Sequence, residues 1–245
     1  MDRVRMDSPI SAVLVSWGNA WLGGHVGLDE AVDHVERAGG PQVVADGPRE
    51  STLRAFLAGL RADGLGSFRL ALPIPGDPLG LAGPPTFNIS AIEAGQAAIA
   101  VLRGRRLGLV PEADRRGSSY SGVRWTVVES ADSEPYVPSL AEAEQALTAA
   151  MRAATNALVG VAGPGPGTPA LKDGGETLAP GYSGRAHRVG ALAARLAMAL
   201  DLAGERGLTS GQLAARSEAL RELDRAVRRA RVAAHHAIVE GQRQG

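Results

Sequence analysis

The sequence predicts an α/β protein with a mixed sheet, tending towards the α+β class, followed by a wholly helical C-terminal region. Three observations predict this. Short apolar runs alternate with helical patterns in the first half, antiparallel strand patterns follow, and from residue 139 the pattern is helical. The 245 residues are 44% hydrophobic and 21% charged, the balance of a globular protein with a substantial core.

The alternation in the first half predicts strands and helices in turn. SAVLVSW (11–17) is an apolar run typical of a buried strand, LDEAVDHVERAG (28–39) has helical spacing, and QVVAD (42–46) is strand-like. STLRAFLAGLRADG (51–64) is again helical, and SFRLALPI (67–74) is the third strand. This β-α-β-α-β order predicts a parallel start to the sheet, with right-handed crossovers.

An antiparallel meander follows. QAAIAVLRGRRLGLVPE (96–112) is typical of two strands around a tight Arg-Gly turn. GVRWTVVES (122–130) is a further strand, in which Val123, Trp125 and Val127 alternate to one side. The sheet is therefore expected to contain antiparallel as well as parallel strands.

The helical region shows helix starts that can be recognised from their caps. Ser139 and Glu142 form a capping box, and Thr209 and Gln212 form a second one before the last helix. Between them, Ser183 is suited to cap a helix that begins at the next residue.

The last helix carries an apolar seam with a seven-residue repeat, which suits helix–helix packing and predicts helix-mediated assembly. We expect this helix to pair with the Ala-rich helix before it, with the 139–160 helix alongside. The seam consists of Leu213, Leu220, Leu223, Val227, Ala230, Ala234 and Ala237.

These patterns divide the chain into an α/β mixed-sheet domain, residues 1–135, and a helical region, residues 136–245. Within the second, residues 163–181 are rich in Pro and Gly and poor in apolar side chains. Such a composition predicts a flexible connection.

Composition excludes some chemistry. There is no cysteine, so disulfides, thiolate metal sites and cysteine nucleophiles are ruled out, and 26 basic residues balance 26 acidic ones. The apolar run after Arg3 and Arg5 is short for a signal peptide, and no stretch approaches the roughly eighteen apolar residues that span a bilayer. A cytoplasmic protein without membrane contact is the expectation, and no cofactor-binding motif is recognised, so no cofactor is predicted.

The loop LPIPGDPLGLAGPPTFN, residues 72–88, is rich in Pro and Gly yet apolar, so we expect it to be packed. It follows the carboxyl end of a predicted strand, a favoured ligand position, and Asp77 could accept a hydrogen bond from a ligand hydroxyl. Backbone N–H groups around Gly80 and Gly83 could hold an anion, and Asn88 could cap the next helix or reach the same space. The structural alternative, which we prefer, is that Asp77 closes a turn and the apolar residues seal the sheet edge.

A second candidate site follows the first predicted strand. His25 and Asp29 are four residues apart and share a face if the helix begins early, and Trp17 and Trp21 could wall the site. One histidine with carboxylates is a poor zinc or iron site, however, and His236 near the C-terminus lacks a matching motif on another helix. No metal site is predicted.

Arginines line one side of the last helix and acids interleave with them, so the stripe is either a phosphate-binding surface or, as we prefer, a solvated face with i,i+4 ion pairs. The arginines are Arg221, Arg225, Arg228 and Arg229, and the acids are Glu218, Glu222 and Asp224.

Several segments together resemble a family of actinobacterial proteins of unknown function. They are the PGDPLGLAGP segment that runs into ISAIEAGQAAIAV, then LGLVPE, VRWTVVES and the Ala/Arg-rich helical C-terminus. The resemblance spans most of the chain and implies no particular activity, cofactor or active site.

No nucleophile, base and orienting group stand at a recognisable spacing, so the sequence leans against a catalyst. The leading hypothesis is a cytoplasmic protein-interaction or scaffold protein with a protein partner or a second copy of itself. The alternative is a small-molecule-binding protein or enzyme with a pocket at the carboxyl edge of the sheet near residues 76–88. Nucleic-acid binding through the Arg-rich last helix is the third and least favoured hypothesis.

Overall fold

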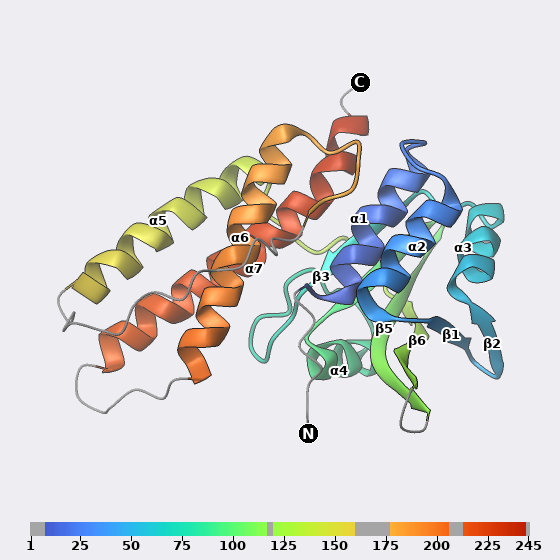
Figure 1. The fold of residues 1–245 in the computed structure, drawn as a ribbon, viewed down its shortest axis with the longest axis horizontal. Coiled ribbons are helices and arrows are strands. Elements are labelled where there is room, and N and C mark those ends of the chain that lie inside the picture. Colours follow the sequence, from blue (N-terminus) through green and yellow to red (C-terminus); the bar gives the residue numbers. More distant parts are fainter. Residues whose placement is uncertain (1–7, 117–119, 160–176, 206–212, 244–245) are drawn as a thin grey trace.

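The computed structural model describes residues 8–116, 120–159, 177–205 and 213–243, and it confirms the mixed α/β class with a helical C-terminal region (Figure 1). The described helices are α1 (Ile10–Leu22), α2 (Leu28–Gly39), α3 (Leu53–Ala62), α4 (Pro85–Ala94), α5 (Leu140–Val159), α6 (Gly184–Glu205) and α7 (Leu213–Arg243). The described strands are β1 (Gln42–Asp46), β2 (Arg49–Thr52), β3 (Ser67–Ala71), β4 (Ala97–Leu102), β5 (Arg105–Arg116) and β6 (Tyr120–Ser130).

The six strands form one sheet in the order β2-β1-β6-β5-β4-β3. Only β1 and β6 pair in parallel, and the other neighbours are antiparallel. The predicted parallel β-α-β-α-β start is therefore wrong, although the antiparallel β4–β5–β6 meander is confirmed. The antiparallel pairs β3–β4, β4–β5 and β5–β6 carry the chain across the sheet, so that β6 returns beside β1 and β3 lies at the far edge.

The predicted first strand is a helix. Residues 11–17 belong to α1, which is buried on several sides because it contacts α2, α7 and strands β3 to β5. A helix covered in this way is apolar all round and lacks the polar face that reveals an amphipathic helix. A short apolar run of this kind cannot be assigned to helix or strand by its periodicity.

Helices cover both faces of the sheet (Figure 1). On one face, α1, α2 and α3 bury a core that includes Phe68, Leu109 and Trp125, all with 0% exposure. On the other face, α4 and the loop before it cover strands β3 to β5 through Leu81 and Phe87. The predicted inward alternation of β6 is confirmed, because Val123 and Trp125 are buried and Val127 packs on the first of these cores.

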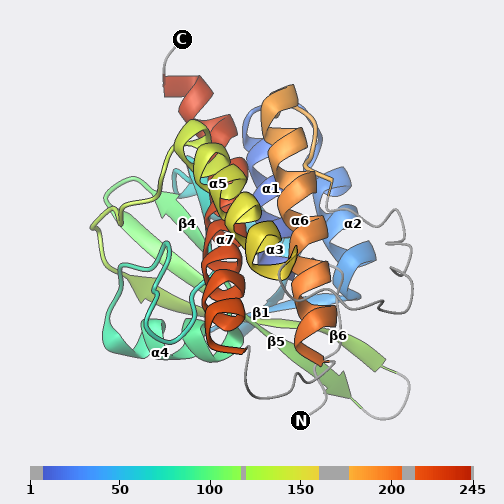
Figure 2. The ribbon, with the colours of Figure 1, turned by 90° about the vertical axis from the view of Figure 1, so that its left-hand side faces the viewer.

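Helices α5, α6 and α7 form a three-helix arm beside the sheet, in which α5 and α6 both pack against α7 (Figure 2). The heptad seam faces inward over part of its length, since Leu223, Val227, Ala230 and Ala234 are buried in the core of this arm. The seam between Leu223 and Ala234 thus packs within the chain and is not available for the predicted assembly. The side chain of Leu213 lies outside the described part of the helix.

Two of the predicted caps are confirmed. The Ser139 N–H donates to Glu142 Oε2 at 2.9 Å, and the Glu142 N–H donates to Ser139 Oγ at 3.3 Å, which completes the capping box of α5. Ser183 Oγ accepts from the Ala186 N–H at 3.2 Å and so caps α6. The box at 209–212 lies outside the described residues.

The predicted flexible loop is described only at its end. Residues 163–176 lie outside the described residues, but Leu178 and Ala179 are buried, and the Ala179 N–H donates to Ser16 Oγ at 2.8 Å. This end of the loop is therefore packed against α1, which the composition of the loop did not predict.

The division at residues 135 and 136 stays a prediction. Within the described ranges, no helix combines the length and apolar character needed to cross a membrane.

Side chains close the free edge of β3. The Asn19 side chain on α1 accepts from the Phe68 N–H at 2.7 Å and donates to the Phe68 carbonyl at 2.9 Å. On α7, His236 Nε2 accepts from the Leu70 N–H at 2.9 Å. An edge strand presents unpaired backbone groups that can template other chains, and here three of them are satisfied by side chains from two helices.

The buried His236 is expected to make folding pH-dependent. Burial, and then the nearby charges of Arg69 and His235, lower the pKa of His236 from 6.5 to about 3. Above the unfolded pKa both states are neutral. As the pH falls below it, only the unfolded state takes up the proton, so this contribution to stability is lost at up to about 1.4 kcal/mol per pH unit.

Replacing His236 by glutamine, which keeps an acceptor, is expected to flatten this slope between pH 6 and pH 4 relative to the wild type. Chemical denaturation at each pH measures it, with His187→Gln on α6 as the control that should keep the slope. Equal slopes for wild type and His236→Gln would contradict the assignment.

Candidate functional site

The loop of residues 72–88 is packed, as predicted. Leu72, Leu79 and Leu81 are at most 6% exposed. Ile74 and Asp77 exchange both backbone hydrogen bonds at 3.0 Å, which closes the Pro-Gly turn between them. The loop thus folds back on the sheet edge.

The Asp77 side chain connects this loop to α7. Its Oδ2 accepts from Arg228 Nη2 and Arg229 Nη1, both at 2.9 Å, and its Oδ1 accepts from Arg229 Nη2 at 3.1 Å. Arg228 also donates to the Leu72 carbonyl at 3.2 Å and to Asp224 at 3.0 Å. Burial by itself would raise the pKa of Asp77, but the hydrogen bonds and charges of the two arginines outweigh it and lower that pKa. The observed contacts are those of a structural clamp.

Replacing Asp77 by alanine is expected to lower the free energy of unfolding by about 1–3 kcal/mol, because two partly buried guanidinium groups lose their shared acceptor. The matched control is Asp224→Ala, since Asp224 pairs with the same Arg228 but its side chain is 46% exposed. That variant should lose less than about 1 kcal/mol. Urea denaturation of both variants measures the difference, and equal losses would contradict the clamp.

The other residues predicted in this loop have structural contacts. Gly80 has φ +86°, and a Cβ there would lie 2.9 Å from the Leu70 carbonyl oxygen, so close packing on β3 explains this glycine. Asn88 lies inside α4, which begins at Pro85, so its predicted capping role is wrong. Its Nδ2 instead donates to the Gly83 carbonyl at 3.2 Å.

The second predicted site is not assembled. Because α2 begins at Leu28, His25 precedes the helix, and its ring packs on the backbone of Gly181. Asp29 forms an ion pair with Arg54 on the surface, and this hydrogen bond, followed by the charge of Arg54, lowers the pKa of Asp29. His25 and Asp29 therefore have different neighbours, and neither contacts the 72–88 loop in the interactions described.

The arginines of the stripe on α7 form ion pairs with carboxylates of the same chain. Arg221 pairs with Glu218 at 3.1 Å, and Arg225 pairs with Glu222. Together with the pairs of Arg228 and Arg229, these give every arginine of the stripe an intramolecular carboxylate partner. Such ion pairs within the chain are what the acids between the arginines predicted.

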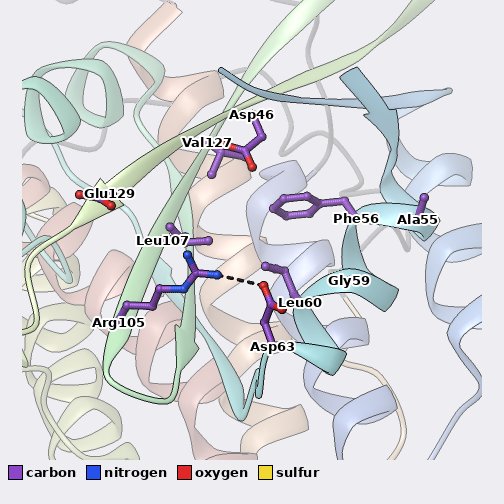
Figure 3. Close-up of a pocket in the computed structure, with 10 residues that line it drawn as sticks. All are labelled: Asp46, Ala55, Phe56, Gly59, Leu60, Asp63, Arg105, Leu107, Val127 and Glu129. Atoms are coloured by element: carbon purple, nitrogen blue, oxygen red, sulfur yellow. Dashed lines mark hydrogen bonds and ion pairs between the residues drawn. The ribbon is translucent and has the colours of Figure 1, made fainter. Parts of the chain in front are cut away.

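A cavity of about 330 Å³ lies between α3 and the sheet (Figure 3). Its apolar wall is made of Leu60 and Leu107, which are buried, with Phe56 and Val127, which are partly buried. The ring of Phe56 points from α3 towards the strands.

The polar rim of this cavity comes from strand ends and from Asp63, which follows α3. Asp46 is the last residue of β1, and Glu129 is the penultimate residue of β6. Opposite them, Arg105 Nη2 donates to Asp63 Oδ2 at 3.0 Å. The cavity therefore lies at the carboxyl ends of the parallel pair β1–β6, the position at which α/β sheets favour ligands.

A second cavity, of about 90 Å³, lies beside His236 and the ion pair of Arg69 with Glu134. Neither cavity is lined by residues 76–88, where the sequence predicted a pocket. In the described part of the chain, no group of three or more His, Cys, Asp or Glu side chains is arranged to hold a metal ion.

Together the fold and these sites define an α/β protein with a three-helix arm, a clamped loop and a cavity at the end of its parallel strands. The chain belongs to the family of Rv1486c-like proteins. The model of the N-terminal domain of that family matches residues 11–140, and the model of its C-terminal domain matches residues 141–232. The predicted resemblance to an actinobacterial family is thereby confirmed.

Two relatives are proteins of Mycobacterium tuberculosis. They are the uncharacterized protein Rv1486c of strain H37Rv and the uncharacterized protein MT1533 of strain CDC 1551. Each is 30% identical over 191 residues, which cover 60% of this chain and 63% of the relative. The match thus spans less than two thirds of the length of these relatives. No solved structure matches the chain.

Proposed function

We propose that the protein is a non-catalytic, cytoplasmic interaction protein that assembles with a second copy of itself through α6. The observation that supports this is a run of five apolar residues, 196–200, none of which is buried by the described fold.

The two halves of α6 differ in their burial. In the first half, Ala186, Val189 and Ala193 are buried in the core of the arm. Further along, each residue of the stretch 196–200 (Leu-Ala-Met-Ala-Leu) is only partly buried. Leu196, Ala197 and Leu200 pack in part against the core of the arm, so the partly exposed apolar surface at this level is centred on Met198 and Ala199. Contiguous apolar surface of this kind is characteristic of protein interaction sites.

The flanking charges favour a second copy as the partner. Arg195 and Asp201 lie three residues before and three residues after Met198. In a two-fold contact, residue i of one copy meets residue j of the other and j meets i, so antiparallel α6 helices centred on Met198 would place Arg195 of each copy opposite Asp201 of the other. The alanines on either side of Met198 would allow the helices to approach closely.

Light scattering on the wild type and on Met198→Glu tests the proposal. We expect the wild type to be a dimer and the variant to be a monomer of unchanged helical content, because a carboxylate at the centre of an apolar contact is left without solvent. The control is Ala153→Glu on an exposed position of α5, which should remain dimeric. A wild type that stays monomeric at high concentration, or a dimer unaffected by Met198→Glu, would overturn the proposal.

A further inference from the structure

We propose that the cavity between α3 and the sheet binds a small organic cation, a protonated amine carried by a flat apolar body. This inference is independent of the assembly through α6, because the cavity lies on α3 and the sheet, away from the helical arm.

The apolar wall specifies one end of the ligand. Leu60 and Leu107 are 4% and 8% exposed, and the ring of Phe56 stands beside them (Figure 3). A volume of about 330 Å³ falls at the lower end of the range for small-molecule pockets, which is roughly 300–1,000 Å³. An aromatic ring is flat enough to lie between the Phe56 side chain and the strands, and its burial there is favourable.

The charge of the rim specifies the other end. Asp63 is paired with Arg105, whereas Asp46 and Glu129 have no ion-pair or hydrogen-bond partner among the side chains that the structure describes. Three carboxylates thus surround the cavity with a single guanidinium. Their excess negative charge favours a cation over a neutral or anionic ligand.

Gly59 lines the cavity. It lies within α3, and a Cβ at this position would meet no atom within 4 Å. Glycine in a helix interior costs about 1 kcal/mol relative to alanine, so the local fold does not explain its presence. A leucine side chain at residue 59 has open space beside the cavity and is expected to narrow it.

The experiment uses tryptamine as the probe, with indole-3-propionate as the anionic counterpart that has the same ring. Isothermal titration calorimetry on the full chain is expected to show tryptamine binding with a dissociation constant below about 1 mM and no measurable binding of indole-3-propionate. Binding should weaken as salt is added, because the rim charges are accessible to solvent.

Two variants assign the binding to this cavity. Gly59→Leu is expected to abolish tryptamine binding while raising the melting temperature of the protein, because leucine is a better helix former than glycine. The double variant Asp46→Asn/Glu129→Gln should weaken binding about tenfold. Glu93→Gln, on α4 at the opposite face of the sheet, is the control and should bind like the wild type.

The proposal is overturned by any of three results. These are tryptamine binding weaker than about 1 mM, equal binding of the anion, or unchanged binding by a folded Gly59→Leu variant. The oligomeric state of the same samples reports separately on α6, so failure of one proposal is distinguishable from failure of the other.

Discussion

Replacing Asn19 by leucine is expected to lower the free energy of unfolding by about 2–6 kcal/mol, because it leaves two buried backbone groups without a partner. Leucine has nearly the shape of asparagine but can neither accept from the Phe68 N–H nor donate to the Phe68 carbonyl. Asn19 is 3% exposed, so water does not replace it. Each orphaned buried group costs about 1–3 kcal/mol.

Denaturant unfolding followed by circular dichroism measures this loss. The matched control is Asn156→Leu, since Asn156 is exposed on α5 and its replacement should change stability by no more than about 0.5 kcal/mol. If the two leucine variants were equally stable, the closure of the β3 edge by Asn19 would contribute nothing and its assigned role would be wrong.

Replacing Phe87 by alanine is expected to cost about 3–5 kcal/mol, the range for truncating a buried aromatic side chain. Phe87 is fully buried and holds α4 on the sheet. Its ring lies directly on Gly108 of β5, where a Cβ would approach the Phe87 ring to 2.1 Å. Because Gly108 has no side chain, there is room for the ring on the strand. For the same reason Gly108 cannot fill the cavity that truncation of the ring leaves.

The control for this substitution lies on the same helix. Ile89 is 56% exposed, so Ile89→Ala should change the free energy of unfolding by no more than about 0.5 kcal/mol. Thermal and urea unfolding are measured for both alanine variants. Because each variant places alanine in α4, the difference between their losses of stability reports the burial of Phe87 and not a change in helix propensity. A loss of less than about 1 kcal/mol for Phe87→Ala would show that the neighbouring residues collapse into the space.

Sequence reasoning succeeded where the signal is local. The helix α2 has a polar and an apolar face, the β4–β5 hairpin has a tight turn, and the cap of α5 lies in four consecutive residues, Ser139 to Glu142. In each case neighbours in the sequence determine the structure. The packing of the 72–88 loop was also predictable, because its leucines are costly to expose.

The missed features depend on contacts between distant segments. The prediction of a strand at residues 11–17 is wrong because α1 is surrounded on several sides by segments from other parts of the chain. A helix buried in this way needs no polar face, so its sequence lacks the pattern that marks an amphipathic helix. The pairing of β1 with β6 joins residues about 80 positions apart, and no local pattern marks it. Because this pairing creates the carboxyl edge shared by Asp46 and Glu129, the cavity was not predicted either.

The Asp77 clamp shows an intermediate case. The Pro-Gly-Asp-Pro turn is readable in the sequence, and so is the arginine stripe of α7. Their meeting is not, because Asp77 and Arg228 are 151 residues apart. Turn chemistry predicted that Asp77 closes the loop. The structure shows that its backbone does so, whereas its side chain binds two arginines of α7 that only the tertiary fold brings near.

The closure of the β3 edge imposes an order on biosynthesis. The Leu70 N–H finds its acceptor 166 residues further along the chain, on the last described helix. While the ribosome is still making the arm, Asn19 can already protect Phe68, but the neighbouring backbone group of the same strand has no partner from α7. A chain that ends before residue 236 lacks the acceptor of the Leu70 N–H, so the β3 edge stays open at Leu70 to pairing with other chains even where Asn19 covers Phe68.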